Sequence, residues 1–214
     1  MTVTLKQYTE NPSWSSSPFP MYGLPNTAFS LVPGLLTTLT GKRALIVGGT
    51  GGIGRALAQA LADNSTLTTV VGRTFRDEGR ANLTFVKCDL SLMAEAQRVA
   101  ASLPAEELDI VAFTAGIVPG KARVETREGV ELDMAASALS RWVMLKQMLP
   151  RLKPSARIFI WGFPGSKGYM AKTALDDFNS VRSYHGGFET AHVSARVPVE
   201  RSEHPRGAPL LLLS

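Results

Sequence analysis

The sequence contains a single cysteine, Cys88, among its 214 residues. One thiol excludes an internal disulfide and removes the thiolate ligands that a structural zinc site usually needs. We therefore expect no metal site and a reducing, cytoplasmic setting.

Long apolar runs are absent as well. No stretch approaches the roughly 18 to 20 apolar residues that a membrane-spanning helix requires, and the N-terminus lacks a basic region followed by an apolar signal core. We expect a soluble protein that does not act at a membrane.

Clusters of one charge are also missing. The 23 Lys and Arg against 18 Asp and Glu give a formal net charge of +5 and a pI of 9.6, but the basic residues are spread along the chain without interleaved aromatics. Surfaces that bind nucleic acids usually concentrate such residues. We therefore expect no nucleic-acid partner, whereas a dinucleotide, which also carries phosphates, suits the mildly basic balance.

The sequence does contain a regular succession of apolar segments. With 44% hydrophobic residues, the chain is long enough for one folded unit with a sizeable core. Short apolar runs predict strands at residues 44–47, 67–71, 83–86, 108–113 and 158–161. Apolar residues at helical spacing predict helices at residues 53–61, 94–103 (opened by Ser91) and 125–152.

Strands that alternate with helices in this way imply right-handed crossovers. The predicted fold class is α/β, a Rossmann-type doubly wound parallel sheet in three layers, α/β/α. Residues 1–40, rich in Ser, Pro and Thr, are expected to form an N-terminal arm, and residues 41–184 the dinucleotide-binding domain. Residues 185–214 are expected to form an irregular tail, because several prolines interrupt them.

A glycine-rich turn follows the first predicted strand. Gly48, Gly52 and Gly54 have the spacing G-x-x-x-G-x-G and stand directly before a helix. Glycines allow a tight turn and a close approach of backbone to phosphate, and the helix start attracts an anion. Glycine-rich loops also occur for conformational reasons alone, but here strand, turn and helix follow in the required order. The predicted phosphate-binding residues are Gly48, Thr50, Gly51, Gly52, Ile53 and Gly54.

Residues Val47–Gly54 resemble the T-G-x-x-x-G-x-G fingerprint of the short-chain dehydrogenase/reductase family, with Val47 in place of the usual Thr. The segment Lys87–Ser91 resembles the family's D-L segment, which implies that Asp89 and Leu90 contact adenine. Phe113–Gly116 resembles N-N-A-G and retains Ala115 and Gly116, which implies a place beside the cofactor. With Leu149–Leu152 and the strand after it, the resemblance covers residues 41 to about 163.

The residues after the second predicted strand bear on the choice of cofactor. A basic residue there accommodates the 2′-phosphate of NADP, whereas an acidic one favours NAD. Arg73 takes this position, with Arg55 as a helper, so we expect NADP rather than NAD. Two alternatives stay open, because an exposed arginine is often simply solvated and Asp89 could cap the following helix.

The family's catalytic Asn-Ser-Tyr-Lys set is not in its usual place. Ser137 stands where the Asn would be, Tyr169 and Lys172 are three rather than four residues apart, and Tyr184 has Phe188 at the fourth position. His192 has the right separation from Arg196 but differs in type. The candidates for proton transfer are Ser166, Tyr184 and His192.

The family continues into two further strands beyond its catalytic helix, whereas this chain stops at Ser214, so we expect the C-terminal part of the sheet to be incomplete. An open sheet edge and the apolar run Leu210–Leu213 favour self-association. Segments such as Trp161–Gly165 resemble divergent members of the family from filamentous fungi. The resemblance implies an NAD(P)(H)-dependent oxidoreductase acting on a carbonyl or alcohol of a small organic molecule, with secondary metabolism as the setting. The alternative is a catalytically inactive dinucleotide-binding protein that serves as a sensor or an oligomer partner.

Overall fold

The structure is a computed structural model that describes residues 39–118, 120–161, 177, 179–182, 184 and, for the backbone, 210–213. All but two residues of the predicted N-terminal arm lie outside this part of the chain, as does most of the predicted tail. The boundaries predicted for the three segments therefore stay predictions.

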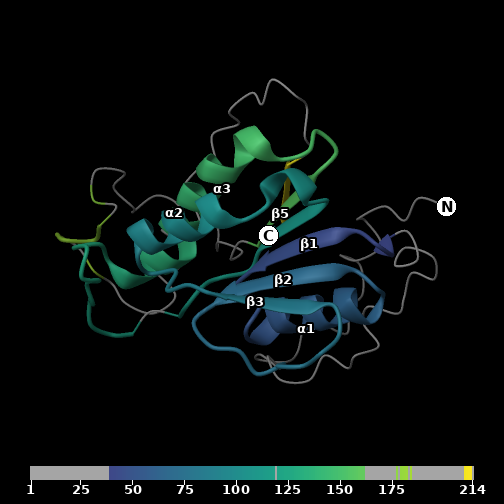
Figure 1. Cartoon of the computed structure of the whole chain (residues 1–214). Helices are drawn as coiled ribbons and strands as arrows, with labels where there is room; N and C mark the ends of the chain where they lie inside the picture. Colours follow the sequence, from purple (N-terminus) through teal and green to yellow (C-terminus); the bar gives the residue numbers. More distant parts are fainter. Residues whose placement is uncertain are drawn as a thin grey trace, which may run out of the picture. The chain divides into compact units, whose positions relative to one another are not determined.

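A six-stranded parallel sheet forms the centre of the described part, in the order β3-β2-β1-β4-β5-β6 (Figure 1). The chain runs outward from β1 to β3 and then returns to place β4 on the other side of β1. Ligands of such sheets bind beyond the carboxyl ends of the strands at this reversal. The strands are β1 (Arg43–Val47), β2 (Leu67–Gly72), β3 (Leu83–Lys87), β4 (Ile110–Phe113), β5 (Arg157–Trp161) and β6 (Leu210–Leu213). The predicted Rossmann-type sheet is confirmed.

The strand β6 lies in a segment that the sequence predicts to be irregular, and for these four residues that prediction is wrong. Leu210–Leu213 pair in parallel with β5, from Ile158 opposite Leu210 to Trp161 opposite Leu213. The edge of β5 offers unpaired N–H and C=O groups, and a short apolar segment without a proline can pair with them. The edge of β5 that the prediction left open is therefore paired.

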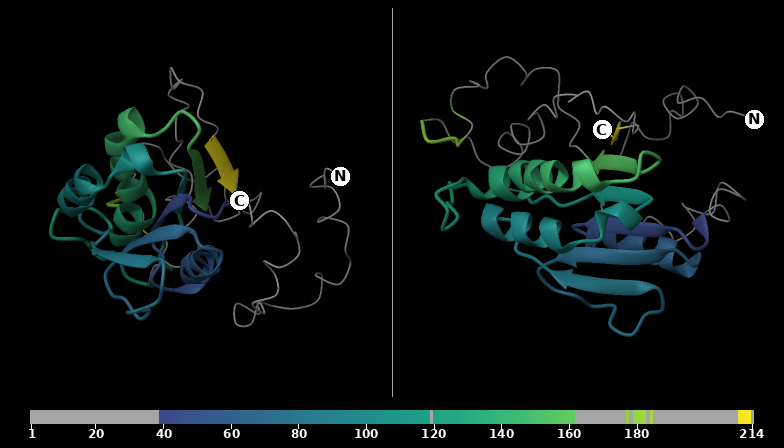
Figure 2. Two further views of the ribbon diagram at one scale, coloured as in Figure 1. Left: turned by 45° about the vertical axis from the view of Figure 1, so that its right-hand side comes forward. Right: turned by 45° about the horizontal axis from the view of Figure 1, so that its top comes forward.

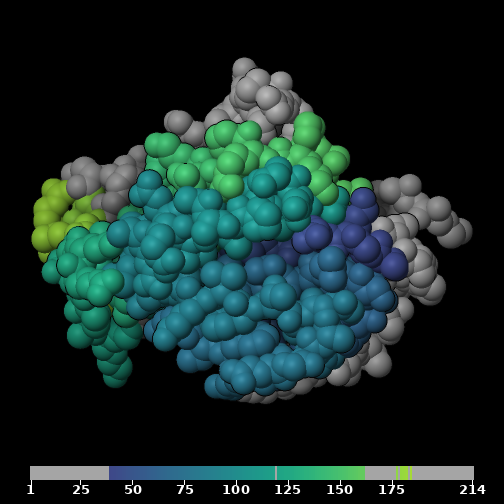
Figure 3. All heavy atoms as spheres, viewed as in Figure 1, coloured from purple at the N-terminus to yellow at the C-terminus, as the bar shows by residue number. Residues whose placement is uncertain are grey.

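Helices cover both faces of the sheet (Figure 2). On one face lie α2 (Met93–Ser102) and α3 (Ser140–Met148), which pack against each other and onto Leu45, Val111 and Phe113. On the other face α1 (Gly52–Asp63) packs onto Ala44, Ile46 and Val70. Alternate residues of β1 thus enter opposite cores, which explains why the whole strand is apolar. The space-filling view shows α2 and α3 side by side as one surface (Figure 3).

The helix predicted for residues 125–152 begins later than expected. Gly129 has a φ of +75°, and Glu125 forms an isolated antiparallel bridge with Glu131, so the chain up to residue 131 turns back on itself. The helix starts where the Glu131 carboxylate accepts the backbone N–H groups of Asp133 and Met134. It continues through a wide π-helical segment, η6 (Met134–Leu139), into α3 and ends in the short turn η7 (Leu149–Arg151).

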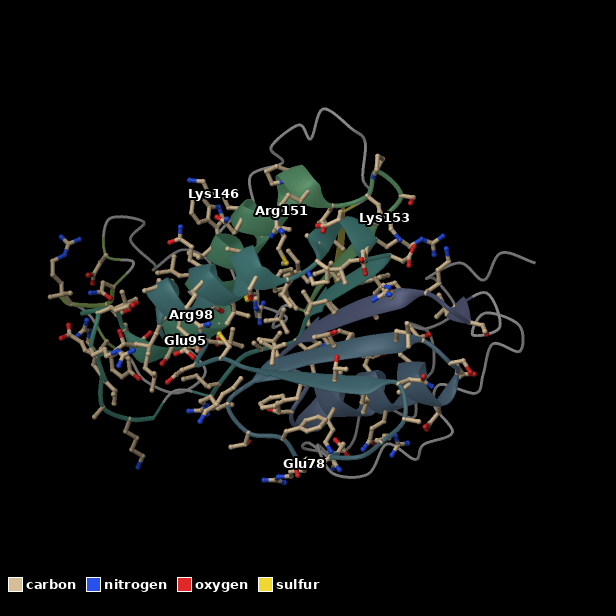
Figure 4. All side chains as sticks on the ribbon, viewed as in Figure 1. Glu78, Glu95, Arg98, Lys146, Arg151 and Lys153 are labelled. Atoms are coloured by element: carbon tan, nitrogen blue, oxygen red, sulfur yellow. The ribbon has the colours of Figure 1, made fainter. Side chains whose placement is uncertain are left out.

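Helix α2 receives the caps of both its ends from distant residues. The prediction that Ser91 opens this helix is wrong, because Leu92 stands at the N-cap and Glu128 accepts the N–H groups of Met93 and Ala94. At the other end Arg151 donates to the carbonyl oxygens of Ala100 and Leu103, at 2.7 and 3.0 Å (Figure 4). A carboxylate at the N-terminus and a cation at the C-terminus both complement the helix dipole. The short turn η5 (Ala105–Glu107) then leads into β4.

Candidate dinucleotide-binding site

The glycine turn lies at the carboxyl end of β1, at the reversal of strand order. Gly48 has a φ of +92°, and a Cβ placed on it would lie 2.4 Å from the backbone nitrogen of Ala115. A Cβ on Gly54 would lie 2.3 Å from Thr114 Oγ1 and 2.5 Å from the Gly48 oxygen. Both glycines are therefore required by close packing, the first against the end of β4 and the second between α1 and the sheet.

The middle of the turn is open instead. A Cβ on Gly51 or Gly52 would meet no atom within 4 Å, and both residues are exposed. No side chain caps the start of α1, and its first turn carries no acidic residue. The N–H groups of a helix start lack partners within the helix, so this open surface suits an anionic group. Ile53 is 43% exposed beside it, while Thr50 packs against Gly72 at the end of β2.

Arg73 and Asp89 follow the neighbouring strands β2 and β3, and Arg73 is exposed. Partial burial alone would raise the pKa of Asp89, but hydrogen bonds from Ser91 and the charges of Arg73 and Arg127 hold the pKa below its ordinary value. Asp89 accepts bonds from the Ser91 N–H at 3.0 Å and its hydroxyl at 2.7 Å. The carboxylate thus closes the turn before α2 rather than capping the helix, and Leu90 beside it is buried.

The structure gives Arg55 a partner that the sequence did not suggest. Its guanidinium forms two hydrogen bonds with Asp77, at 2.7 and 2.8 Å, and Gln59 donates to the same carboxylate. The bond from Arg55 holds the pKa of Asp77 below its ordinary value, and Gln59 acts in the same direction. Arg55 is therefore engaged with Asp77, and Arg73 is the exposed cation that directly follows β2.

Ala115 and Gly116 follow β4, and two side chains from the long helix hold the backbone around them. Ser137 Oγ accepts the N–H of Ile117 at 3.0 Å and donates to Asp133. Arg141 donates to the carbonyl oxygens of Ala115 and, at 2.7 Å, of Trp161. Sequence reasoning missed Arg141 and Asp133, although their spacing of four residues from Ser137 places all three on one helical face.

Of the three candidates for proton transfer, the structure describes Tyr184 alone, so it does not bring them together. The Tyr184 hydroxyl donates to the carbonyl oxygen of Gly120 at 3.0 Å, on the segment that follows β4. Ser166 and His192 lie outside the described residues. The catalytic assignment therefore stays a prediction, and so does the set of cofactor contacts.

This fold and this turn define the class of protein. Residues 44–137 match the sequence model of the NAD dependent epimerase/dehydratase family, and this range runs from β1 through Ser137. Together with the relatives below, the match confirms the resemblance to the short-chain dehydrogenase/reductase family. No helix in the part of the chain that the structure describes is long and apolar enough to cross a membrane.

Two relatives with similar sequences come from fungi. An uncharacterized oxidoreductase of Saccharomyces cerevisiae is 42% identical over 155 residues, which cover 68% of this chain and 49% of the relative. A short chain dehydrogenase/reductase of Colletotrichum higginsianum is 30% identical over 134 residues, covering 55% of this chain and 33% of the relative. The chain thus spans about half the length of the first relative and a third of the second.

Two solved structures with a similar fold contain a bound nicotinamide dinucleotide. The NADH-dependent reductase A1-R′ complexed with NAD has a TM-score of 0.55 and 21% identity, covering 75% of this chain and 70% of the other. The Pseudomonas aeruginosa RhlG/NADP active-site complex has a TM-score of 0.51 and 25% identity, covering 74% and 64%. One of these proteins holds NAD and the other NADP.

Proposed function

We propose that this chain binds a nicotinamide dinucleotide, NADP(H) in preference to NAD(H), and acts as an oxidoreductase on a carbonyl or alcohol of a small organic molecule. The observation that carries the proposal is the open start of α1 at Gly51 and Gly52, where a side chain would meet no other atom and where no side chain caps the helix. The N–H groups there would hold the pyrophosphate, and the helix dipole would favour its charge. The bound dinucleotide would supply or accept the hydride.

Topology divides the site into two halves. The strands β2 and β3 would carry the adenosine half, with Asp89 and Leu90 beside adenine and Arg73 beside the 2′-phosphate. The strands β4 and β5 would carry the nicotinamide half, with Ala115 and Gly116 beside it. We favour NADP because Arg73 is exposed, whereas Arg55 is held by Asp77.

Reduction of a carbonyl also needs a proton for the developing alkoxide. Of the three candidates, the described Tyr184 hydroxyl donates to Gly120, on the segment that follows the end of β4. Ser166 and His192 stay candidates on sequence grounds alone.

One observation favours a second function, a dinucleotide-binding protein without turnover. The helical position that carries Asn in the family carries Ser137, whose hydroxyl is engaged with the Asp133 carboxylate and the Ile117 N–H. A hydroxyl with both partners in the protein is poorly placed to organise a proton relay.

The test separates binding from turnover. Fluorescence titration with NADPH and NADH measures binding, and a panel of carbonyl compounds followed by loss of NADPH absorbance measures turnover. Binding with turnover supports the enzyme, and binding without turnover supports the second function. The purified wild-type chain binding neither cofactor at millimolar levels overturns both.

A matched pair of variants locates the site. Gly51 is extended, with φ −159° and ψ 170°, and has free space at its Cβ, so Gly51→Val should fold and yet lose affinity because its side chain occupies the phosphate position. Gly120 has the same free space outside the turn, so Gly120→Val should keep the affinity of the wild type. Wild-type affinity in Gly51→Val as well as in Gly120→Val would exclude the turn as the binding site.

A further inference from the structure

Two side chains of the long helix hold the backbone on either side of Gly116. Ser137 in η6 accepts the N–H of Ile117, and Arg141 in α3 donates to the carbonyl oxygen of Ala115. A Cβ on Gly116 would lie 3.5 Å from both Arg141 Nη2 and Ser137 Oγ, so the glycine lies directly against the two side chains. The peptide groups that flank Gly116 are therefore fixed from the helix side.

Arg141 also reaches the next strand. Its Nη1 donates to the carbonyl oxygen of Trp161, the last residue of β5, at 2.7 Å. The planar guanidinium presents its N–H groups in a rigid fork, so one side chain can hold two carbonyl oxygens at a fixed separation. Arg141 thus links the carboxyl ends of β4 and β5.

The side chain that makes this link is a cation that has lost part of its hydration. Burial lowers the pKa of Arg141 to about 10, against a smaller opposing effect of Asp133, so the group is still charged at neutral pH. Its Nε is inaccessible and has no hydrogen-bond partner among the described residues. Where a cation is partly buried and loses hydration, an apolar side chain is often as stable or more so. Stability alone therefore does not explain an arginine here.

We propose that Ser137 and Arg141 form a clamp that fixes residues 115–117 and the end of β5 as the wall for the nicotinamide ring. Arg141 is then a positioning residue that acts through the backbone. This inference rests on the proposed function, because the two strand ends receive the nicotinamide half only if the pyrophosphate lies at the start of α1. A wall held in advance spares the ligand the entropy of ordering it.

The test compares each cofactor with its counterpart that lacks the nicotinamide ring. NADPH is paired with 2′-phospho-ADP-ribose, and NADH with ADP-ribose. The pair is chosen according to which cofactor the wild type binds more tightly, and calorimetry then measures the affinity of each variant for both ligands of that pair. Arg141→Met should weaken the full dinucleotide about tenfold or more and leave the ringless ligand within about twofold. Arg141→Lys keeps the charge but lacks the fork, so it should stay weakened. Arg98→Met, at an exposed position of α2, should change neither affinity.

Ser137→Ala provides the same comparison with a smaller change, in case Arg141→Met does not fold, and thermal denaturation shows which variants keep the fold. A loss shared equally by the two ligands, or no loss in either, overturns the clamp while the proposed function stands. A wild-type chain that binds none of the four ligands overturns the proposed function, and the clamp with it.

Discussion

Arg55, which directly follows the last glycine of the turn, forms a two-pronged ion pair with Asp77, five residues after the end of β2. The pair connects the first turn of α1 with the loop that leaves β2, so the loop beside the proposed adenosine site is held in place. A guanidinium with both prongs on a carboxylate has little left for a phosphate.

The ion pair leads to a prediction about cofactor preference. Arg73→Ala should reduce the ratio of NADPH to NADH affinity about tenfold or more, since a hydrogen-bonded contact with a charged group contributes about 1.5 to 3 kcal/mol. Arg55→Ala should leave the ratio unchanged, because Asp77 already occupies its guanidinium. Parallel titrations with both cofactors measure the ratio, and an equal fall in the two variants would show that Arg55 also contacts the 2′-phosphate.

A second prediction concerns the glycine at the end of β1. Gly48→Ala should lower the free energy of unfolding by more than 2 kcal/mol, because the new methyl group meets the Ala115 backbone and the residue has a positive φ. Gly79→Ala shares the positive φ, +77°, but has free space, so it should lose only about 1 kcal/mol. Urea denaturation gives both values. Similar losses would mean that the end of β4 can move away from the turn.

The third prediction concerns Asp109, which directly precedes β4 at the amino ends of the strands, away from the glycine turn. Its carboxylate accepts hydrogen bonds from the backbone N–H of Arg43 at 2.9 Å and from the ammonium of Lys153 at 3.0 Å. Lys153 is labelled in Figure 4. Partial burial would raise the pKa of Asp109, but these bonds and the charges of Lys153 and Lys42 lower it from its ordinary value of 3.8. The carboxylate therefore stabilises the fold fully above its unfolded pKa, and this contribution is lost as the pH falls through the lower folded pKa.

Asp109→Asn should accordingly be about 1 to 2 kcal/mol less stable than the wild type at pH 7, with the gap closing as the pH falls below 3.8. Urea denaturation at a series of pH values measures the gap. Asp63→Asn, at an exposed pair with Arg80, is the control and should show a small difference throughout. A gap for Asp109→Asn that does not depend on pH would contradict the mechanism.

A fourth prediction uses the single thiol as a probe of the native state. Cys88 is fully buried, and burial raises its pKa to about 12, so almost no thiolate exists at pH 8. Ellman's reagent should therefore label the native chain only as fast as it opens, and label one thiol per chain at once in guanidinium chloride. Saturating cofactor should slow the native labelling, since ligand binding lowers the open population. Immediate labelling of the native chain would show that Cys88 is accessible.

Much of the fold follows from local patterns. The run Ala44–Val47 is apolar because both faces of β1 are covered, and Gly48 and Gly54 are glycines because neighbouring atoms leave no room for a Cβ. The atoms that exclude a Cβ belong to residues 114 and 115, but the apolar run and the glycine spacing are themselves local, so they can be read directly from the sequence. The glycine turn and the parallel sheet were predicted for this reason.

Features that depend on distant residues could not be predicted in the same way. The cap of α2 comes from Glu128, 35 residues beyond the helix start, and β6 forms only because the edge of β5 is there to pair with. Arg141 was missed because an arginine on an amphipathic helix is usually solvated. Its partners are backbone carbonyl groups, which leave no trace in the sequence.

The carboxylate of Glu128 has a consequence for where an anion can settle. It occupies the N–H groups at the start of α2, and Glu131 does the same at the start of the long helix that becomes α3. Across the stretch from residue 39 to residue 161, α1 is then the one long helix whose beginning carries no acidic group of its own. These two carboxylates would repel a phosphate at the other helix starts, and so would direct a negatively charged ligand to the glycine turn.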